Sequence, residues 1–130
     1  MILLSNDIIN NYIDCCIGSN GSHYDISFVI YNILKDDFRY VGHNTWEYKI
    51  NNEWKIDEKN TRLKYAIKSD VNNHFIERSK FWTDKSNVND INIEIDNKLK
   101  SLKILQFSNK LKDDKFILQI IKEVKQFYDK

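Results

Sequence analysis

The chain has 130 residues, of which 42% are hydrophobic and 13% aromatic, so it carries enough apolar surface to fold around one core. Proline is absent and glycine occurs only at Gly18, Gly21 and Gly42, which excludes a GxGxxG turn and a GxxxxGK[ST] phosphate loop. Twenty basic and nineteen acidic residues leave a net charge of +1, and only three of the basic residues are arginine. This balance does not predict strong non-specific binding to nucleic acid.

The cysteines and histidines predict neither a disulfide framework nor a metal centre. Cys15 and Cys16 are neighbours, and a bridge between adjacent residues is strained, so we expect reduced thiols in an intracellular protein. His23, His43 and His74 have no ligand spacing, so no metal or other cofactor is expected. The apolar start of the chain is too short for a signal peptide, and no stretch is long enough to span a membrane. The sequence therefore predicts a protein that is not secreted and has no membrane partner.

The first part of the chain is predicted to be an N-terminal segment followed by a linker. Isoleucines recur there at every fourth residue, which is weak helical spacing, and the run 18–22 is rich in glycine and serine. We place a boundary in that run. The predicted organisation is an N-terminal segment and linker over 1–21 and a single domain over 22–130.

An amphipathic helix is predicted to open the domain. Ser22 followed by Asp25 is typical of a capping box, with Asp in place of the usual Glu. The apolar positions that follow at helical spacing are Ile26, Val29, Ile30, Ile33 and Leu34. The charged run 35–37 ends this predicted helix.

Alternation with a period of two then predicts three short strands, over 38–41, 46–50 and 54–56. A two-residue loop would pair Tyr48 with Lys55 and place the apolar residues of the last two strands on opposite faces. A three-residue loop pairs Tyr48 with Trp54 instead and gathers the aromatic side chains on one face. We favour the three-residue loop, because a slip by one residue would expose two tryptophans. We expect the aromatic face to pack on the helix that precedes the strands.

Three further helices are predicted after the strands, the first of them capped by Asn60 or Thr61. Its apolar face consists of Leu63, Ile67, Val71, Phe75, Arg78 and Trp82. The second pattern consists of Val88, Ile91, Ile95, Leu99 and Leu102. The third begins after Asp113 and Asp114 and consists of Ile117, Ile120, Ile121, Val124 and Tyr128. The predicted fold is therefore α+β: an amphipathic helix, a small three-stranded antiparallel meander, and then about three helices.

Glu94 and Asp96 are the only paired carboxylates that we weigh as a catalytic site. In a strand they would share one face, as in the two-metal sites of small nucleotidyl-transfer enzymes. In a helix the isoleucines around them join a longer apolar stripe and the acids are solvated. We favour the helix because its pattern extends further along the chain. No GxSxG elbow is present and no base lies next to Cys15, so no catalytic residue is predicted.

Two groups of residues are candidates for contact with nucleic acid or a partner. The aromatic side chains Trp46, Tyr48 and Trp54 have the chemistry of a platform on which single-stranded bases stack. The lysines of the stretch 98–115 are candidates for phosphate contacts; they include Lys98, Lys100, Lys103, Lys110 and Lys112. The simpler interpretation is that the aromatic face is covered by a helix and the lysines are solvated.

Five segments of the chain follow one another in an order that is characteristic of a known family. They are HYDI at 23–26, YNILKDDF at 31–38, WEYKINNEWKID at 46–57, TRLKYAI at 61–67 and IKEVKQFYD at 121–129. Together they resemble the pre-helicase region of the primase–helicase, or replicative NTPase, family of large DNA viruses. The resemblance covers about residues 23–130 and leaves the N-terminal segment unassigned.

In that family, similar segments lead directly into the superfamily 3 helicase part, and the primase chemistry lies N-terminal to them. The Walker motifs have no counterpart in this sequence, so no catalytic residue is carried over and the chain by itself is expected not to be an enzyme. The resemblance implies a non-catalytic connecting and oligomerisation module, present as a fragment, a split gene product or an excised domain. The alternative is a stand-alone adaptor that binds single-stranded nucleic acid.

The resemblance also implies where the protein works and what it contacts. The expected partners are other copies of the chain or the helicase part of a replication protein, and any DNA contact is expected to be weak. The expected location is a viral replication site in the host cytoplasm or nucleus.

Overall fold

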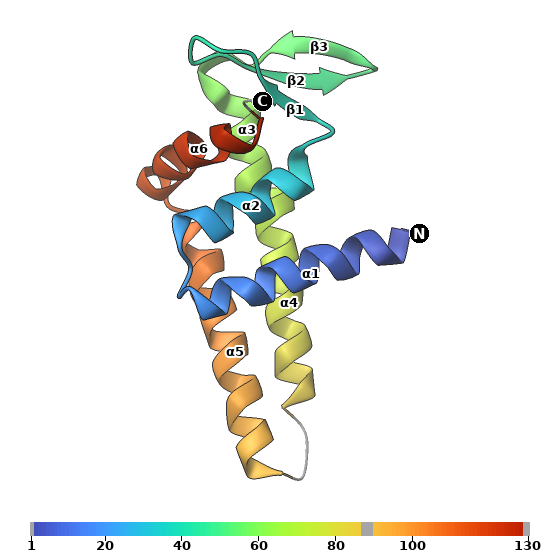
Figure 1. Ribbon diagram of the computed structural model, residues 1–130, viewed down its shortest axis with the longest axis vertical. Helices are drawn as coiled ribbons and strands as arrows, with labels where there is room; N and C mark the ends of the chain where they lie inside the picture. Colours follow the sequence, from blue (N-terminus) through green and yellow to red (C-terminus); the bar gives the residue numbers. More distant parts are fainter. Residues whose placement is uncertain (1, 87–89, 129–130) are drawn as a thin grey trace.

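The computed structural model describes residues 2–86 and 90–128 and has the predicted α+β architecture, with helices, then a three-stranded antiparallel sheet, then helices (Figure 1). In chain order the elements are α1 (Ile2–Gly18), α2 (His23–Leu34), β1 (Phe38–Tyr40), β2 (Trp46–Ile50), β3 (Glu53–Ile56), the 3-10 turn η1 (Glu58–Asn60), α3 (Thr61–Ala66), the π-helical segment η2 (Ile67–Val71), α4 (Asn72–Lys85), α5 (Ile91–Lys110) and α6 (Asp114–Tyr128).

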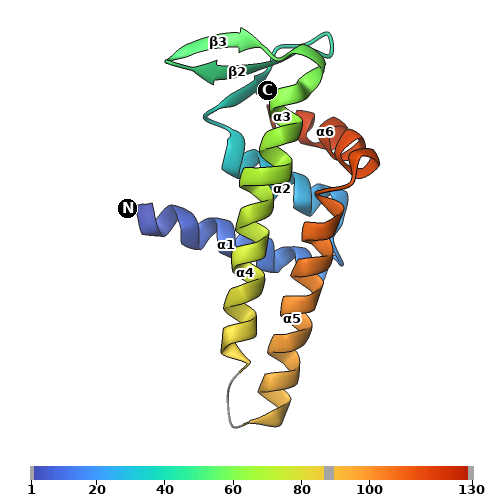
Figure 2. The same ribbon diagram turned by 180° about the vertical axis from the view of Figure 1, so that it is seen from behind.

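A long helical hairpin dominates the molecule. α3, η2 and α4 run on from one another, and α5 packs alongside α4 in the opposite direction (Figures 1 and 2). The end of this hairpin nearest the 86–90 connection extends beyond α1, while the sheet lies at the opposite end of the molecule. α2 packs on α6 and α1 packs on α2, so the core lies between these helices and the hairpin.

The core contains most of the predicted apolar positions. Those of the second and fourth predicted helices that are buried are Leu63, Ile67, Val71, Phe75, Ile117, Ile120, Ile121 and Val124. α1 adds Ile9, Ile13 and Cys16 to the same buried cluster. The helical interpretation of both patterns is confirmed.

The connection between α1 and α2 depends on one glycine. Gly21 has a φ of +74°, and a Cβ atom there would lie 2.5 Å from the ring of Phe107 on α5. Only glycine fits both constraints, because it lacks a Cβ atom and accepts positive φ at no steric cost. The next residue, Ser22, caps α2 as predicted, since its hydroxyl accepts a hydrogen bond of 3.1 Å from the amide of Asp25.

The register predicted for the hairpin of β2 and β3 is wrong. The strands are joined by a two-residue loop, Asn51 and Asn52, and Ile50 pairs with Glu53. Both asparagines have positive φ, 52° and 63°, which is the geometry of the type I′ turn that matches the twist of paired strands. Asparagine tolerates this conformation at both positions, so the tight loop forms without glycine.

The two faces of the sheet differ because of this register. Trp46 lies on the inner face, where its ring centroid is 5.0 Å from that of Tyr128. The cover comes from the end of α6, and not from the helix before the strands as we expected. Trp54 pairs with Lys49 and lies on the outer face, where the guanidinium of Arg39 stands 4.3 Å above its ring. The stacked arginine covers part of Trp54, so this ring needs no place in the core.

The N-terminus of α3 is capped differently from our prediction. Asn60 has a φ of 58° and its side chain makes no capping hydrogen bond. The buried carboxylate of Asp57 accepts hydrogen bonds from the amides of Arg62 and Leu63, each 2.8 Å long. The cap is therefore supplied from before the η1 turn, which folds Asp57 back over the first turn of the helix.

Candidate functional site

The main candidate surface is the outward face of α5. The predicted helix over this region is confirmed, although Val88 of its pattern lies outside the described residues. An amphipathic stripe ordinarily faces the core of its own chain. Here the stripe faces away from it: its five members are between 42% and 62% exposed, and they are Ile91, Ile95, Leu99, Leu102 and Leu105. We refer to these five residues as the α5 stripe.

The opposite face of α5 is buried and largely polar. The hydroxyl oxygens of Ser79 on α4 and Ser101 on α5 lie 2.9 Å apart, and each hydroxyl also contacts the backbone carbonyl oxygen of the other residue. Thr83 joins them, with its hydroxyl oxygen 2.6 Å from that of Ser101. Further along, the hydroxyl of Ser108 donates to the side-chain oxygen of Asn72. We call this set of contacts the serine seam.

The serine seam explains why α5 faces this way. Small side chains let two helices approach closely, and hydroxyls buried between them need partners. Asn97 continues the seam, with its amide nitrogen 2.8 Å from the carbonyl oxygen of Lys85. Turning the α5 stripe toward α4 would expose a seam that is already hydrogen-bonded and would force leucines into a narrow space.

The structure does not form the paired-carboxylate site. Residues 94 and 96 lie in a helix, where positions two apart point to different sides. Glu94 instead pairs along the helix with Lys98, at 3.2 Å. In the described parts of the chain, no three His, Cys, Asp or Glu residues are grouped so that they could hold a metal ion.

The three predicted aromatic contact residues do not form one platform. Trp46 is 1% exposed, so its ring is not available for stacking on a base. Tyr48 is half-buried on the same face, with the guanidinium of Arg62 4.5 Å above its ring. Trp54 is on the opposite face of the sheet with Arg39. The sequence argument failed here because it relied on the three-residue loop.

The candidate lysines of α5 and of the turn after it do not lie together on one face either. Lys100 stands 4.3 Å above the ring of Trp82, and the ammonium group of Lys103 donates to the side chain of Asn20 over 2.8 Å. Lys110 is 5.9 Å from the ring of Phe116, and Lys112 is exposed after the helix ends. Several of these cations are thus engaged within the chain and are spread around α5. The sheet lies well away from the first turns of α5 (Figure 1).

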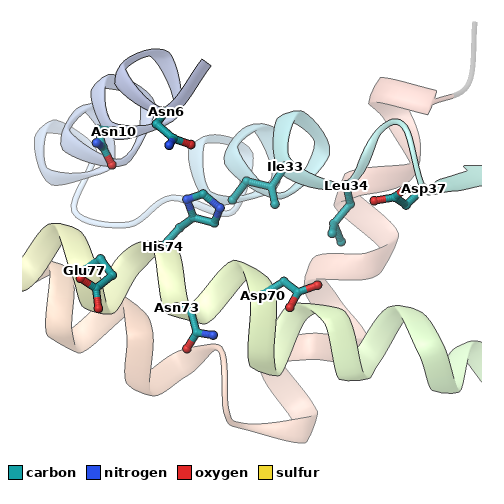
Figure 3. A pocket seen from close by; sticks show the side chains of 9 residues that line it. All are labelled: Asn6, Asn10, Ile33, Leu34, Asp37, Asp70, Asn73, His74 and Glu77. Atoms are coloured by element: carbon teal, nitrogen blue, oxygen red, sulfur yellow. The ribbon is translucent and has the colours of Figure 1, made fainter. Parts of the chain in front are cut away.

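A polar cleft of about 550 Å³ lies between α1, the end of α2 and the region where η2 meets α4 (Figure 3). Sequence reasoning missed it, because its walls come from distant segments. The sequence did contain one signal: Asp70, Asn73, His74 and Glu77 are polar and are spaced by three and four residues, so they share one face of η2 and α4. The lining residues are Asn6, Asn10, Ile33, Leu34, Asp37, Asp70, Asn73, His74 and Glu77.

The residues that line the cleft are suited to binding polar or cationic groups. Burial lowers the pKa of His74 below its ordinary value of 6.5, and the nearby carboxylate of Asp70 opposes this shift only in part. The imidazole is therefore neutral at pH 7. Asp37, Asp70 and Glu77 make the local potential negative. The described residues that line the cleft include no serine, cysteine or lysine, so they offer no nucleophile of those types.

The adjacent cysteines are in different environments. Cys15 is exposed, whereas Cys16 is buried and its thiol lies 3.5 Å from the carbonyl oxygen of Tyr12. Burial raises the pKa of the Cys16 thiol to about 12, so it stays protonated and serves as a small core residue.

Comparison with known proteins assigns no family to the chain. Over residues 2–86 and 90–128, none of the helices combines the length and apolar character required to cross a membrane. No protein-family model matches the chain, and no curated protein matches it.

Proposed function

We propose that this chain is a non-catalytic connecting and oligomerisation module of a viral DNA-replication primase–helicase. The observation that carries the proposal is the α5 stripe, a continuous set of large apolar side chains that the chain itself leaves exposed. Contiguous apolar surface of this kind marks sites of protein–protein contact. The module works by packing and subunit contact, and its partners are other copies of the chain or the helicase part of the replication protein.

The packing of the segments that carry the family resemblance supports this proposal. The segment 46–57 and the described part of the segment 121–129 are far apart in the sequence, yet the rings of Trp46 and Tyr128 meet with centroids 5.0 Å apart. The segment 61–67 starts with α3, whose N-terminus is capped by Asp57 of the segment 46–57. These segments therefore form one packed unit, which is what a rigid connector between larger parts requires.

The test is ATP hydrolysis by the purified chain, measured with and without single-stranded DNA. We expect no hydrolysis above the buffer rate, because no phosphate loop is present in the sequence. DNA-stimulated hydrolysis by pure protein would overturn the proposal. The gene gives a second test: we expect the reading frame, or an adjacent one, to encode a GxxxxGK[ST] segment. A genome with no such segment beside this gene would favour the adaptor described next.

A second candidate function, an adaptor for single-stranded nucleic acid, is favoured by the outer face of the sheet. There Arg39 stacks on Trp54, and the ammonium group of Lys49 lies 5.8 Å from the same ring. An aromatic ring flanked by two cations matches the stacking and phosphate chemistry of single-strand binding.

This candidate is tested by titrating oligonucleotides at several salt concentrations. If the adaptor interpretation holds, Trp54→Ala weakens binding at least tenfold, and the affinity of the unmodified chain falls steeply with salt. Tyr65→Ala is the matched control, since Tyr65 is 70% exposed and belongs to α3 instead of the sheet. Absence of binding at low salt would remove the candidate.

A further inference from the structure

A second pocket lies between the two N-terminal helices. α1 and α2 pack side by side and run in opposite directions, joined by the tight connection at Gly21 (Figure 1). The pocket has a volume of about 350 Å³, near the small end of the roughly 300–1,000 Å³ that is typical of ligand pockets, and its lining is mostly apolar. The lining residues are Tyr12, Cys15, Tyr24, Asp25 and Phe28, and we call this the tyrosine pocket.

The three aromatic rings of the tyrosine pocket are held by one another and by α6. Tyr12 on α1 and Phe28 on α2 meet with ring centroids 4.7 Å apart and planes at 65°. The ring centroid of Phe127 on α6 is 5.3 Å from that of Tyr24 and 5.5 Å from that of Phe28. These edge-to-face contacts are a favoured geometry for aromatic pairs. The rings therefore need little rearrangement when a ligand binds, which lowers the cost of binding.

The chain supplies no cation to these rings, although it does so for several other aromatic side chains. The rings with an arginine or lysine within about 6 Å of the centroid are Tyr40, Tyr48, Trp54, Phe81, Trp82 and Phe116. Among the described residues, no arginine or lysine makes such a contact with the rings of the tyrosine pocket, and none lines it. Tyr24 is 55% exposed. The rings are therefore available to a cation from outside the chain.

Asp25 gives the tyrosine pocket its negative charge. Its backbone amide donates to the hydroxyl of Ser22, but over residues 2–86 and 90–128 its carboxylate has no hydrogen-bond or ion-pair partner. A carboxylate beside aromatic rings attracts a cation. A primary ammonium group has three donors that would lose water in a mostly apolar pocket. A fully methylated ammonium has no donor to satisfy, so it suits this lining better.

We propose that the tyrosine pocket binds a quaternary ammonium group, such as that of choline or of a trimethylated lysine side chain. The methyl groups of the ligand pack on the rings of Tyr12, Tyr24 and Phe28, whose faces attract the positive charge. The carboxylate of Asp25 balances that charge. This site goes beyond the proposed function and does not depend on it, because the pocket lies away from the α5 stripe, on α1 and α2.

The first experiment titrates the full chain with choline and with its uncharged carbon isostere 3,3-dimethylbutanol, measured by calorimetry. The two ligands have nearly the same shape, so they separate attraction for charge from simple burial of methyl groups. We expect choline to bind at least tenfold more tightly than the isostere. Equal affinities would show an ordinary apolar pocket and would overturn the inference, as would an absence of choline binding.

The source of the ammonium group is identified in the same assay. Nε-trimethyllysine amide represents a modified side chain of a partner protein, and unmodified lysine amide is its control. We expect the trimethylated form to bind at least tenfold more tightly than lysine. The tighter ligand of choline and trimethyllysine amide then identifies the source as a choline compound or a methylated protein. A preference for unmodified lysine overturns the inference.

The second experiment changes the pocket itself. Tyr24→Leu keeps an apolar side chain but removes the aromatic face, and Asp25→Asn removes the charge with little change in shape. We expect each variant to weaken choline binding at least tenfold while circular dichroism stays unchanged. Tyr65→Leu and Asp36→Asn are the matched controls, since both positions are exposed and neither lines the pocket. Pocket variants that bind choline as the controls do would contradict the proposed site.

The third experiment locates the bound ligand without any substitution. Nuclear Overhauser effects are measured between the methyl protons of choline and the ring protons of the chain. We expect them to the rings of Tyr12, Tyr24 and Phe28, because these rings line one pocket. Overhauser effects only to rings elsewhere, such as that of Trp54 on the sheet, would place the ligand outside the tyrosine pocket and overturn the assignment.

Discussion

Helices α5 and α6 have similar apolar patterns in the sequence, but α6 buries its apolar stripe and α5 exposes its own. The stripe of α6 is inside the protein, with Ile117, Ile120 and Val124 all buried. The α5 stripe is outside. The difference lies in the other face of each helix: α5 carries small polar residues at helical spacing, including Ser101 and Ser108, which meet matching residues on α4. α6 has no such second face.

A helix therefore buries the face that its neighbour can satisfy, which need not be the more hydrophobic face. The hydroxyls of the serine seam are hydrogen-bonded, so their burial costs little. The exposed stripe is costly, because burying one large apolar side chain completely stabilises a protein by about 1.5–3 kcal/mol relative to exposure. Covering five half-exposed side chains with a partner recovers part of that free energy. The contrast between the two helices is the physical basis for the proposed role in subunit contact.

The strongest test of the comparison is truncation of the α6 stripe. We expect Ile120→Ala to lower the free energy of unfolding by about 2–5 kcal/mol, because it opens a cavity in a fully packed site. Leu118→Ala, on the exposed side of the same helix, should change it by no more than about 0.5 kcal/mol. Urea titration measures both. Equal effects would mean that α6 does not bury the face described here.

The sequence predicted those parts of the fold in which an element has a single strongly apolar face. The apolar positions from Leu63 to Phe75 could only form one side of a helix, and that helix formed. The sequence could not predict which face of α5 is buried. The small polar residues of α5 indicate a buried face only once the matching residues on α4 are known to lie opposite them. The hairpin register failed for a similar reason. The predicted register was chosen to bury Trp54, whereas in the structure Arg39, from another strand, covers part of its ring.

The candidate site was still less predictable than the fold. The members of the α5 stripe were identified by their period, but their exposure is a property of the packed molecule. The polar cleft escaped notice because Asn10, Asp37 and His74 come from three separate segments. The π-helical segment η2 leads into the helix that carries His74, and apolar spacing across it looks like that of an ordinary helix.

A smaller effect is expected in the serine seam. Ser101→Ala removes a hydroxyl that contacts both Ser79 and Thr83, and we expect a loss of about 1 kcal/mol in the free energy of unfolding. Ser19→Ala is the control, because its hydroxyl bonds lie in the more open connection after α1 and involve no contact with α4. A stabilised Ser101→Ala variant would show that the seam does not determine the orientation of α5.

His74 is a half-buried polar residue on another side of α4, and its titration can be tested. Its pKa in the folded chain is lowered from 6.5, so between the two values the unfolded chain binds the proton more readily. Stability from this residue is therefore present above pH 6.5 and is lost as the pH falls below it. His74→Asn should flatten that part of the pH dependence, whereas His43→Asn, at an exposed turn, should not. Identical profiles for both variants would contradict the lowered pKa of His74.

The smallest effect is expected on the α5 stripe itself, and its size should depend on protein concentration. In dilute solution Leu99→Ala should change the free energy of unfolding by no more than about 0.5 kcal/mol, because Leu99 is 54% exposed within one chain. At high concentration the unmodified chain gains stability from contact between copies, and the variant gains less. The difference between the two proteins should therefore grow with concentration, whereas for Ile120→Ala the loss should persist in dilute solution. A concentration-independent effect of Leu99→Ala would mean that the outward face of α5 has no partner in a second copy, and the contrast with α6 would then reflect the serine seam alone.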